Sequence, residues 1–235
     1  MLRKLLRVLF AALLAITLLS GCATVIPTGS VDPGEPSNSP QESDAPESDQ
    51  EAPALEAGKT AGGKYSNAYF GFECALDDAW HIADEAEMKQ LGLSVAGQSD
   101  LVADALESGK TVFDLYATKD GGVISLNVVL SDLGAAYSLL PGDTVTVGES
   151  EIEQEKTSLA NLGFTNLLGE IDTAEFAGKT CTLICFTADL PTESATFPYY
   201  QRQIMFRRGR YLATVTAASL SQDSTSDILN LFKAS

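Results

Sequence analysis

The spacing of hydrophobic residues in the middle of the chain predicts an antiparallel hairpin. Hydrophobic side chains occupy every second position of one segment, at Ile124, Leu126, Val128 and Leu130. A period of two places all four on one face of a strand. The preceding segment, 111–117, also alternates, and the turn at 119–122 contains two adjacent glycines. The two segments are therefore expected to pair.

Further alternating, aromatic or amphipathic segments extend this pattern. Strands are predicted at 65–76, at 166–175 and 180–188 around a turn at 177–179, and at 199–206 and 211–217 around a turn at 207–210. A spacing of three to four residues predicts helices at 84–91, 99–108 and 149–162. In the last of these, acidic residues gather at the N-terminal end and Gly163 suits the C-terminal cap.

The end of the chain is expected to form one more helix. Asp223 or Ser224 caps it, and its hydrophobic residues Ile228, Leu231 and Phe232 are expected to dock on the sheet. Antiparallel strands that are interrupted by helices are typical of the α+β class, so the predicted fold is an α+β sandwich.

The first residues have the pattern of an export signal. A cationic start is followed by an unbroken hydrophobic run from Val8 to Leu19, which is shorter than the ~20 residues that span a bilayer. The run ends in Leu19-Ser20-Gly21-Cys22, which resembles the lipobox of bacterial lipoproteins. The resemblance implies removal of a signal peptide, 1–21, and attachment of a diacylglycerol to Cys22, which anchors the protein on the extracytoplasmic face of the cell membrane. An ordinary secretory signal with a coincidental cysteine is the alternative.

Residues 22–63 are predicted to be the lipidated cysteine and a disordered tether. The stretch from Ala23 to Gly62 contains no aromatic residue, six of the nine prolines, eight acids and one base. So little hydrophobic surface cannot offset the entropy of ordering the backbone. A recognition tail for a basic partner is the alternative. The globular domain is then expected to span 64–235.

The charge of this domain excludes two classes of partner. Of the 32 acidic and 15 basic residues in the chain, eight acids and four bases precede Lys64, which leaves the domain with a net charge of −13. Nucleic acid and a flat anionic membrane surface both need a basic face. No nucleic-acid partner is therefore expected, and membrane contact is expected only through the lipid anchor.

The start of the domain resembles PsbP-like domains of Gram-positive surface lipoproteins. The shared pattern is Lys64-Tyr65-Ser66-Asn67-Ala68-Tyr69-Phe70-Gly71-Phe72, followed by Trp80. The glycine-turn hairpin, the tyrosine-led strand and the closing helix match as well, whereas the proline that usually precedes the tryptophan is missing. The resemblance implies an α/β/α arrangement, with an antiparallel sheet between helix layers, and an accessory or binding role without shared catalytic residues.

Four arginines lie in or beside one predicted hairpin. Arg202, Arg207, Arg208 and Arg210 fall within nine residues and are followed by Tyr211. Arginine beside aromatic residues is typical of surfaces that bind an anionic polymer or an acidic protein. These five residues are therefore the candidate contact surface for a cell-surface protein or an anionic envelope polymer. A solvated turn whose arginines pair with the abundant acids is the alternative.

The chain shows no motif for catalysis, a cofactor or a metal. His81 is the only histidine, a Gly-x-Ser-x-Gly elbow and a phosphate loop are absent, and the acids between Glu149 and Glu155 lack the spacing of a calcium loop. Those acids are expected to be a solvated helix start. A non-catalytic binding or accessory module is the favoured function. The alternatives are a cell-envelope hydrolase that uses dispersed carboxylates with His81, and a purely structural spacing role.

Three cysteines follow Cys22, at Cys74, Cys181 and Cys185. Cys181 and Cys185 lie four positions apart on one predicted strand, so their Cα atoms are ~13 Å apart and cannot be bridged. Cys74 can pair with one of them only if the first strand neighbours the segment 180–188. Otherwise all three are small buried hydrophobic residues.

Overall fold

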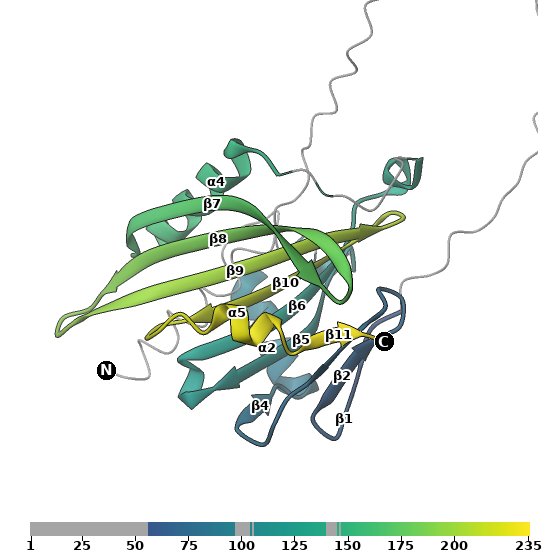
Figure 1. The fold of residues 1–235 in the computed structure, drawn as a ribbon, viewed down its shortest axis with the longest axis horizontal. Coiled ribbons are helices and arrows are strands. Elements are labelled where there is room, and N and C mark those ends of the chain that lie inside the picture. Colours follow the sequence, from purple (N-terminus) through teal and green to yellow (C-terminus); the bar gives the residue numbers. More distant parts are fainter. Residues whose placement is uncertain (1–55, 97–103, 105, 140–144, 146) are drawn as a thin grey trace, which may run out of the picture. The chain divides into compact units, whose positions relative to one another are not determined.

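Two antiparallel sheets form the framework of the domain (Figure 1). The computed structural model describes residues 56–96, 104, 106–139, 145 and 147–235. The strands are β1 Lys59–Ala61, β2 Lys64–Asn67, β3 Phe72–Ala75, β4 Trp80–Ile82, β5 Thr111–Lys119, β6 Ile124–Asp132, β7 Thr165–Phe176, β8 Lys179–Pro191, β9 Thr196–Arg208, β10 Tyr211–Ser219 and β11 Phe232–Ala234. The larger sheet has the order β4-β5-β6-β10-β9-β8-β7, and the smaller one has the order β1-β2-β3-β11.

The two faces of the seven-stranded sheet are covered differently. Helices α2 (Glu85–Ala96) and α4 (Glu149–Asn161) pack on one face. Leu91 of α2 is buried in a cluster with Tyr116 of β5, and Leu159 of α4 is buried in a cluster with Ile184 of β8. The opposite face is covered by the four-stranded sheet and by the short helix α5 (Thr225–Leu229). The helix layers expected on both faces are therefore only partly present, because the smaller sheet covers most of the second face and α5 is the one helix described there.

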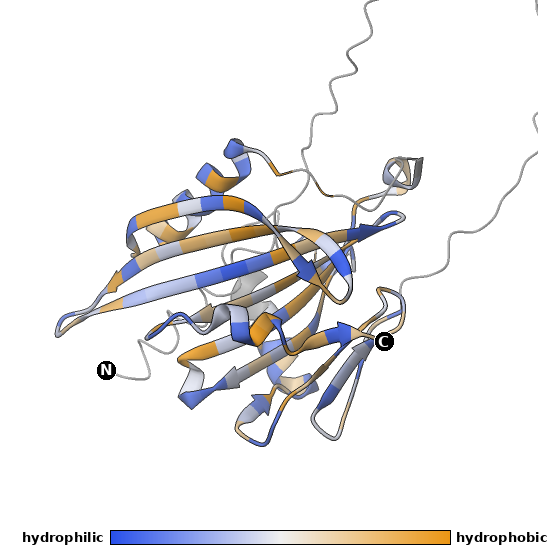
Figure 2. Cartoon of the chain, viewed as in Figure 1, coloured by the Kyte–Doolittle hydropathy of each residue, from blue (hydrophilic) through white to orange (hydrophobic). Residues whose placement is uncertain are grey.

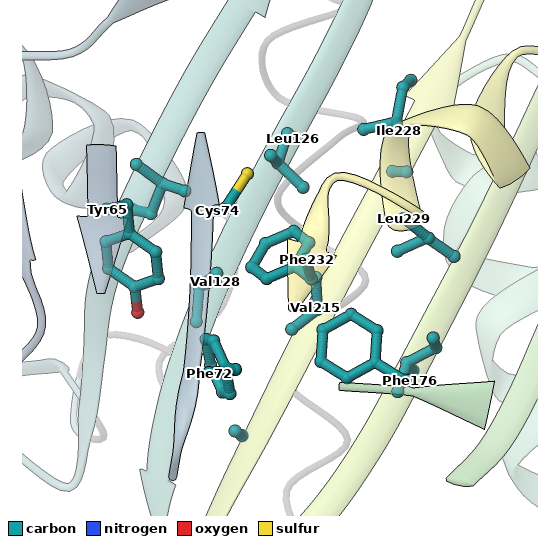
Figure 3. Close-up of a cluster of buried hydrophobic side chains, with 14 of the residues drawn as sticks. Tyr65, Phe72, Cys74, Leu126, Val128, Phe176, Val215, Ile228, Leu229 and Phe232 are labelled. Atoms are coloured by element: carbon teal, nitrogen blue, oxygen red, sulfur yellow. The ribbon is translucent and has the colours of Figure 1, made fainter. Parts of the chain in front are cut away.

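The core between the two sheets contains a cluster of aromatic rings packed among aliphatic side chains (Figure 3). Phe72 of β3 is fully buried, and its ring centroid lies 5.3 Å from that of Phe206 and 5.6 Å from that of Phe232. From the larger sheet, the predicted hydrophobic face of β6 contributes Leu126 and Val128, both fully buried. The period of two in the sequence thus identified the core face of this strand correctly.

Most predicted elements are present, and two are corrected. The segment 65–76 is a hairpin rather than one strand, because β2 and β3 are joined by a turn in which Asn67 Oδ1 accepts a hydrogen bond from the Phe70 N–H (3.0 Å). The closing helix ends at Leu229, and Phe232 belongs to β11, which pairs with β3. Phe232 is buried as predicted, but from a strand of the smaller sheet.

Several predictions concern residues outside the described ranges. These are the export signal, the anchor at Cys22, most of the tether, and most of the helix at 99–108. At the end of the predicted tether, β1 pairs with β2, so regular structure begins at Lys59, ahead of the expected boundary at Lys64. Among the described residues, no helix is long and hydrophobic enough to cross a membrane.

Candidate functional site

The candidate contact surface centres on the turn between β9 and β10. Arg208 and Tyr211 lie directly opposite each other in the ladder, and Gly209-Arg210 forms the turn between them. Gly209 has a φ of 59°, a left-handed conformation that glycine adopts without steric cost. The tight turn therefore holds Arg208, Arg210 and Tyr211 together at one end of the larger sheet.

A tyrosine from the smaller sheet completes the group. Tyr69, in the turn between β2 and β3, packs edge-on against Tyr211 with ring centroids 5.6 Å apart. The guanidinium carbon of Arg208 lies 5.2 Å from the Tyr69 ring centroid, and Arg208 Nη1 donates to the Tyr69 carbonyl. The Tyr69 hydroxyl in turn donates to the Arg208 carbonyl (3.1 Å). Tyr69, Arg208, Arg210 and Tyr211 are called the arginine–tyrosine cluster below.

The two arginines of this cluster differ in their charge partners. Arg210 donates to both oxygens of Asp132, from Nε at 2.8 Å and from Nη2. These hydrogen bonds are the main reason why the pKa of Asp132 is lowered from its ordinary value. Arg208 is exposed and makes no ion pair with a carboxylate within the described ranges. Among the residues that the structure describes, Arg208 is therefore a cation of the β9–β10 turn without an ion-pair partner.

The other two predicted arginines lie elsewhere. Arg202 faces α5, where its Nη1 donates to Asp223 Oδ1 (3.0 Å) and to Thr225 Oγ1 (2.7 Å). Arg207 points to the opposite side of the sheet from Arg208, because successive residues of a strand alternate. Arg207 is 5% exposed, and its Nη1 donates at 2.7 Å to the carbonyls of Tyr137 and Gly209. The buried Arg207 therefore stabilises the β9–β10 hairpin and links it to the segment that contains Tyr137.

The single histidine has a carboxylate partner that its sequence neighbourhood did not reveal. His81 Nε2 lies 2.9 Å from Glu87 Oε2, on the first turn of α2. Glu87 Oε2 also accepts the Asp84 N–H (3.0 Å), and Asp84 Oδ1 accepts the Glu87 N–H (2.9 Å). This reciprocal pair is a capping box. Both side chains of the His81–Glu87 pair are largely exposed, at 65% and 49%.

Glu155 of α4 is buried, which corrects the expectation of a wholly solvated helix start. It is 4% exposed, and its Oε1 accepts a hydrogen bond from Gln201 Nε2 (3.2 Å). Gln201 Oε1 accepts in turn from the Tyr199 hydroxyl (2.5 Å). Burial raises the pKa of Glu155 well above its ordinary value, against the lowering effect of the Gln201 hydrogen bond. In the part of the chain that the structure describes, no cation pairs with this carboxyl group.

The Glu155→Gln variant is expected to be more stable than the wild type at pH 8. A carboxyl group with a raised pKa favours the folded state below its ordinary pKa, and this contribution is lost as the pH rises through the raised value. Glutamine keeps the volume and carries no charge to bury, so we expect Tm to rise by about 2–4 °C at pH 8, which corresponds to ~1 kcal/mol. Calorimetric melting from pH 4 to pH 8 checks this, and Glu153→Gln at an exposed site of the same helix is the control. A pH-independent difference from the wild type would contradict the assignment.

The three described cysteines are free thiols; Cys74 and Cys181 are buried as expected, whereas Cys185 is only partly buried. Cys74 lies on β3, whose neighbours are β2 and β11, while Cys181 and Cys185 lie on β8. The strand adjacency needed for a bridge from Cys74 is therefore missing. Burial raises the pKa of Cys74 to about 12, as expected for a small buried side chain in a hydrophobic core.

Comparison with known proteins gives weak likenesses only. No family model and no curated protein sequence matches the chain. The solution structure of cyanobacterial PsbP (CyanoP) from Synechocystis is 13% identical over 77% of this chain and 95% of that one, with a TM-score of 0.43. A crystal structure from Bacteroides thetaiotaomicron is 9% identical over 74% of this chain and 48% of that one (TM-score 0.34). LpqN of Mycobacterium tuberculosis, described as involved in cell envelope biogenesis, is 10% identical over 68% and 76% (TM-score 0.33). The function of the domain is therefore inferred from its own residues.

Proposed function

We propose that this chain is a lipid-anchored extracytoplasmic lipoprotein whose PsbP-like domain is a non-catalytic binding module. The arginine–tyrosine cluster is its contact surface, and the partner is an acidic cell-surface protein or an anionic envelope polymer. The observation that carries this proposal is Arg208, an exposed guanidinium without a carboxylate partner among the described residues, on a domain with a net charge of −13 by the count above. Lys89 and Lys233 also have no carboxylate partner among the described residues, and Arg208 differs from them in its contact with the Tyr69 ring.

The setting of Arg208 suits the capture of an anion. Stacking on Tyr69 and the hydrogen bond to its carbonyl already restrict the side chain, so less conformational entropy is lost on binding. A guanidinium has five N–H donors, and the ones left over can engage a carboxylate or phosphate with two parallel hydrogen bonds. The neighbouring Tyr211 ring offers a rigid surface of the kind enriched in binding sites.

Arg208→Glu is expected to weaken binding of polyglutamate and polyphosphate by about tenfold or more, because a charge-assisted hydrogen bond contributes about 1.5–3 kcal/mol and the new carboxylate repels the polymer. The two polymers distinguish a carboxylate partner from a phosphate partner. Binding is measured by titration calorimetry at low and moderate salt. Lys89→Glu, at an exposed position of α2, is the control with the same change in charge. Equal binding by both variants would remove the cluster as the contact surface.

The anchor is tested separately. Cys22→Ala removes the sulfur that the lipobox resemblance assigns to the lipid, so the protein is expected to leave the membrane fraction and to keep its signal peptide. Fractionation with a carbonate wash, followed by mass spectrometry of the N-terminus, measures both results. A variant that stays with the membrane would contradict lipid anchoring.

The alternative of an envelope hydrolase depends on His81 and Glu87. Because Glu87 also caps α2, its carboxylate is committed to two partners at once. A panel of ester, amide and phosphate substrates is therefore expected to show no turnover. Turnover that disappears in His81→Ala would replace the binding proposal with an enzymatic one.

A further inference from the structure

The four edge strands of the two sheets differ sharply in length. β1, β4 and β11 have three residues each, whereas β7 has twelve. An edge strand presents unpaired backbone N–H and C=O groups, and proteins commonly keep such strands short to prevent pairing with other chains. Among the described strands, β7 alone departs from this rule.

The edge offered by β7 is regular and exposed. It pairs with β8 without a register shift from Leu168 to Phe176. Residues 170–173 are exposed, although their side chains alternate between the two faces of the sheet. Leu168 (65%) and Ile171 (44%) are the most exposed large hydrophobic side chains in the described ranges, and Figure 2 shows hydrophobic positions along this edge. Such side chains are unusual on an edge that only has to stay solvated.

The charge of β7 identifies the kind of strand that fits. It carries three acids, Glu170, Asp172 and Glu175, and no base. An antiparallel pairing of two copies through β7 would bring the acids of both copies together along one edge, and like charges across a ladder are destabilising. The N-terminal tether is acidic as well, which disfavours it as an occupant in the same way. A strand that carries lysine or arginine is complementary.

We propose that β7 is a docking edge for an extended basic segment of a partner protein, which adds to the larger sheet as an eighth strand. Main-chain hydrogen bonds along the edge supply affinity, as in other cases of strand addition. Lysines or arginines of the segment lie beside Glu170 and Asp172 on one face, and a hydrophobic side chain packs on Ile171 on the other. Asp172 Oδ1 accepts the Thr173 N–H (2.7 Å), which restricts the position of this carboxylate and already occupies that one backbone donor. This surface is separate from the arginine–tyrosine cluster and has the opposite charge preference.

The probe is a short blocked peptide that alternates lysine with valine and threonine. We expect it to bind the full domain and to protect β7 amides from hydrogen exchange. The same peptide with alternate backbone nitrogens methylated keeps every side chain but loses the donors of one edge. It is expected to bind about tenfold or more weakly, since each backbone hydrogen bond contributes ~1 kcal/mol. A peptide with glutamate in place of lysine is expected not to bind.

Variants locate the site on the protein. The double variant Glu170→Lys, Asp172→Lys is expected to lose binding of the lysine peptide and to gain binding of the glutamate peptide. Both acids are exposed and adjacent on one face of the strand. Asp78→Lys with Glu107→Lys makes the same change in net charge at exposed positions elsewhere and is expected to bind like the wild type. Arg208→Glu is also expected to leave this binding unchanged, so the two surfaces are tested independently. Equal binding of the methylated peptide, or no binding of the lysine peptide to the wild type, would overturn strand addition at β7.

Discussion

Replacing Phe72 with alanine is expected to lower the free energy of unfolding by about 3–5 kcal/mol, the range for a large aromatic residue in a packed core. Phe72 is fully buried, and its ring has aromatic neighbours from both sheets. The distances between ring centroids are 6.1 Å to Tyr65, 6.2 Å to Phe70, 5.8 Å to Phe176, 5.3 Å to Phe206 and 5.6 Å to Phe232. Alanine would therefore leave a cavity at this contact and weaken the packing between the two sheets.

Urea denaturation followed by circular dichroism and by fluorescence measures this loss. Phe197→Ala is the matched control, because Phe197 is 37% exposed on β9 and should cost less than about 1 kcal/mol. If both variants lose similar amounts of stability, the smaller sheet is not held to the larger one through Phe72.

Asp114→Ala is expected to cost about 2–5 kcal/mol, because it leaves several donors without an acceptor at once. Asp114 lies at the register shift of β5 and accepts three hydrogen bonds. They come from the Gly58 N–H (2.7 Å), the Tyr65 hydroxyl (2.6 Å) and Asn67 Nδ2 (2.9 Å). Tyr65 and Asn67 are fully buried, so water does not replace the lost acceptor. The polar side chains of Tyr65 and Asn67 in β2 are thus hydrogen-bonded to the larger sheet through one carboxylate, in addition to the hydrophobic contacts of Phe72.

A double-mutant cycle separates this network from simple loss of packing. Tyr65→Phe removes only the hydroxyl, so it should cost about 1 kcal/mol or more in the wild type and clearly less when Asp114 is already alanine. Hydrogen exchange of the β2 amides is expected to accelerate in Asp114→Ala more than exchange of β10. Additive losses in the cycle would show that Tyr65 does not depend on Asp114.

Three hairpins of the larger sheet were predictable because their signals are local. The period of two in β6 and the glycine turns after β5, β7 and β9 are visible in short windows of sequence. The sequence predicts one strand in place of the hairpin of β2 and β3, because the turn contains Tyr69 and Phe70, aromatic residues that also favour strands. The prediction that Phe232 belongs to the closing helix is wrong for a related reason. Its burial was predictable from its hydrophobicity, but its pairing with β3 joins residues that lie far apart in the sequence.

The candidate site was likewise predictable only where its residues are close together in the sequence. Arg208, Arg210 and Tyr211 are close in sequence, so their common position at a hairpin turn was predictable. Tyr69 and Asp132, which orient these arginines, come from distant segments, and only the fold brings them there. Arg207 differs from Arg208 by a single position, and the alternation of the strand sends it into the interior. Burial of Glu155 likewise depends on where α4 meets β9, which composition does not reveal.

The buried thiol of Cys74 also allows transient opening of the domain to be measured. Cys74 is 1% exposed between the two sheets, and with a pKa of about 12 it is almost entirely protonated at neutral pH. The thiolate is the reactive form, so an alkylating reagent added to the native protein can reach and modify Cys74 only during openings that part the sheets. The rate at which Cys74 gains mass therefore measures the frequency of those openings, in wild type and variants alike, without any introduced label.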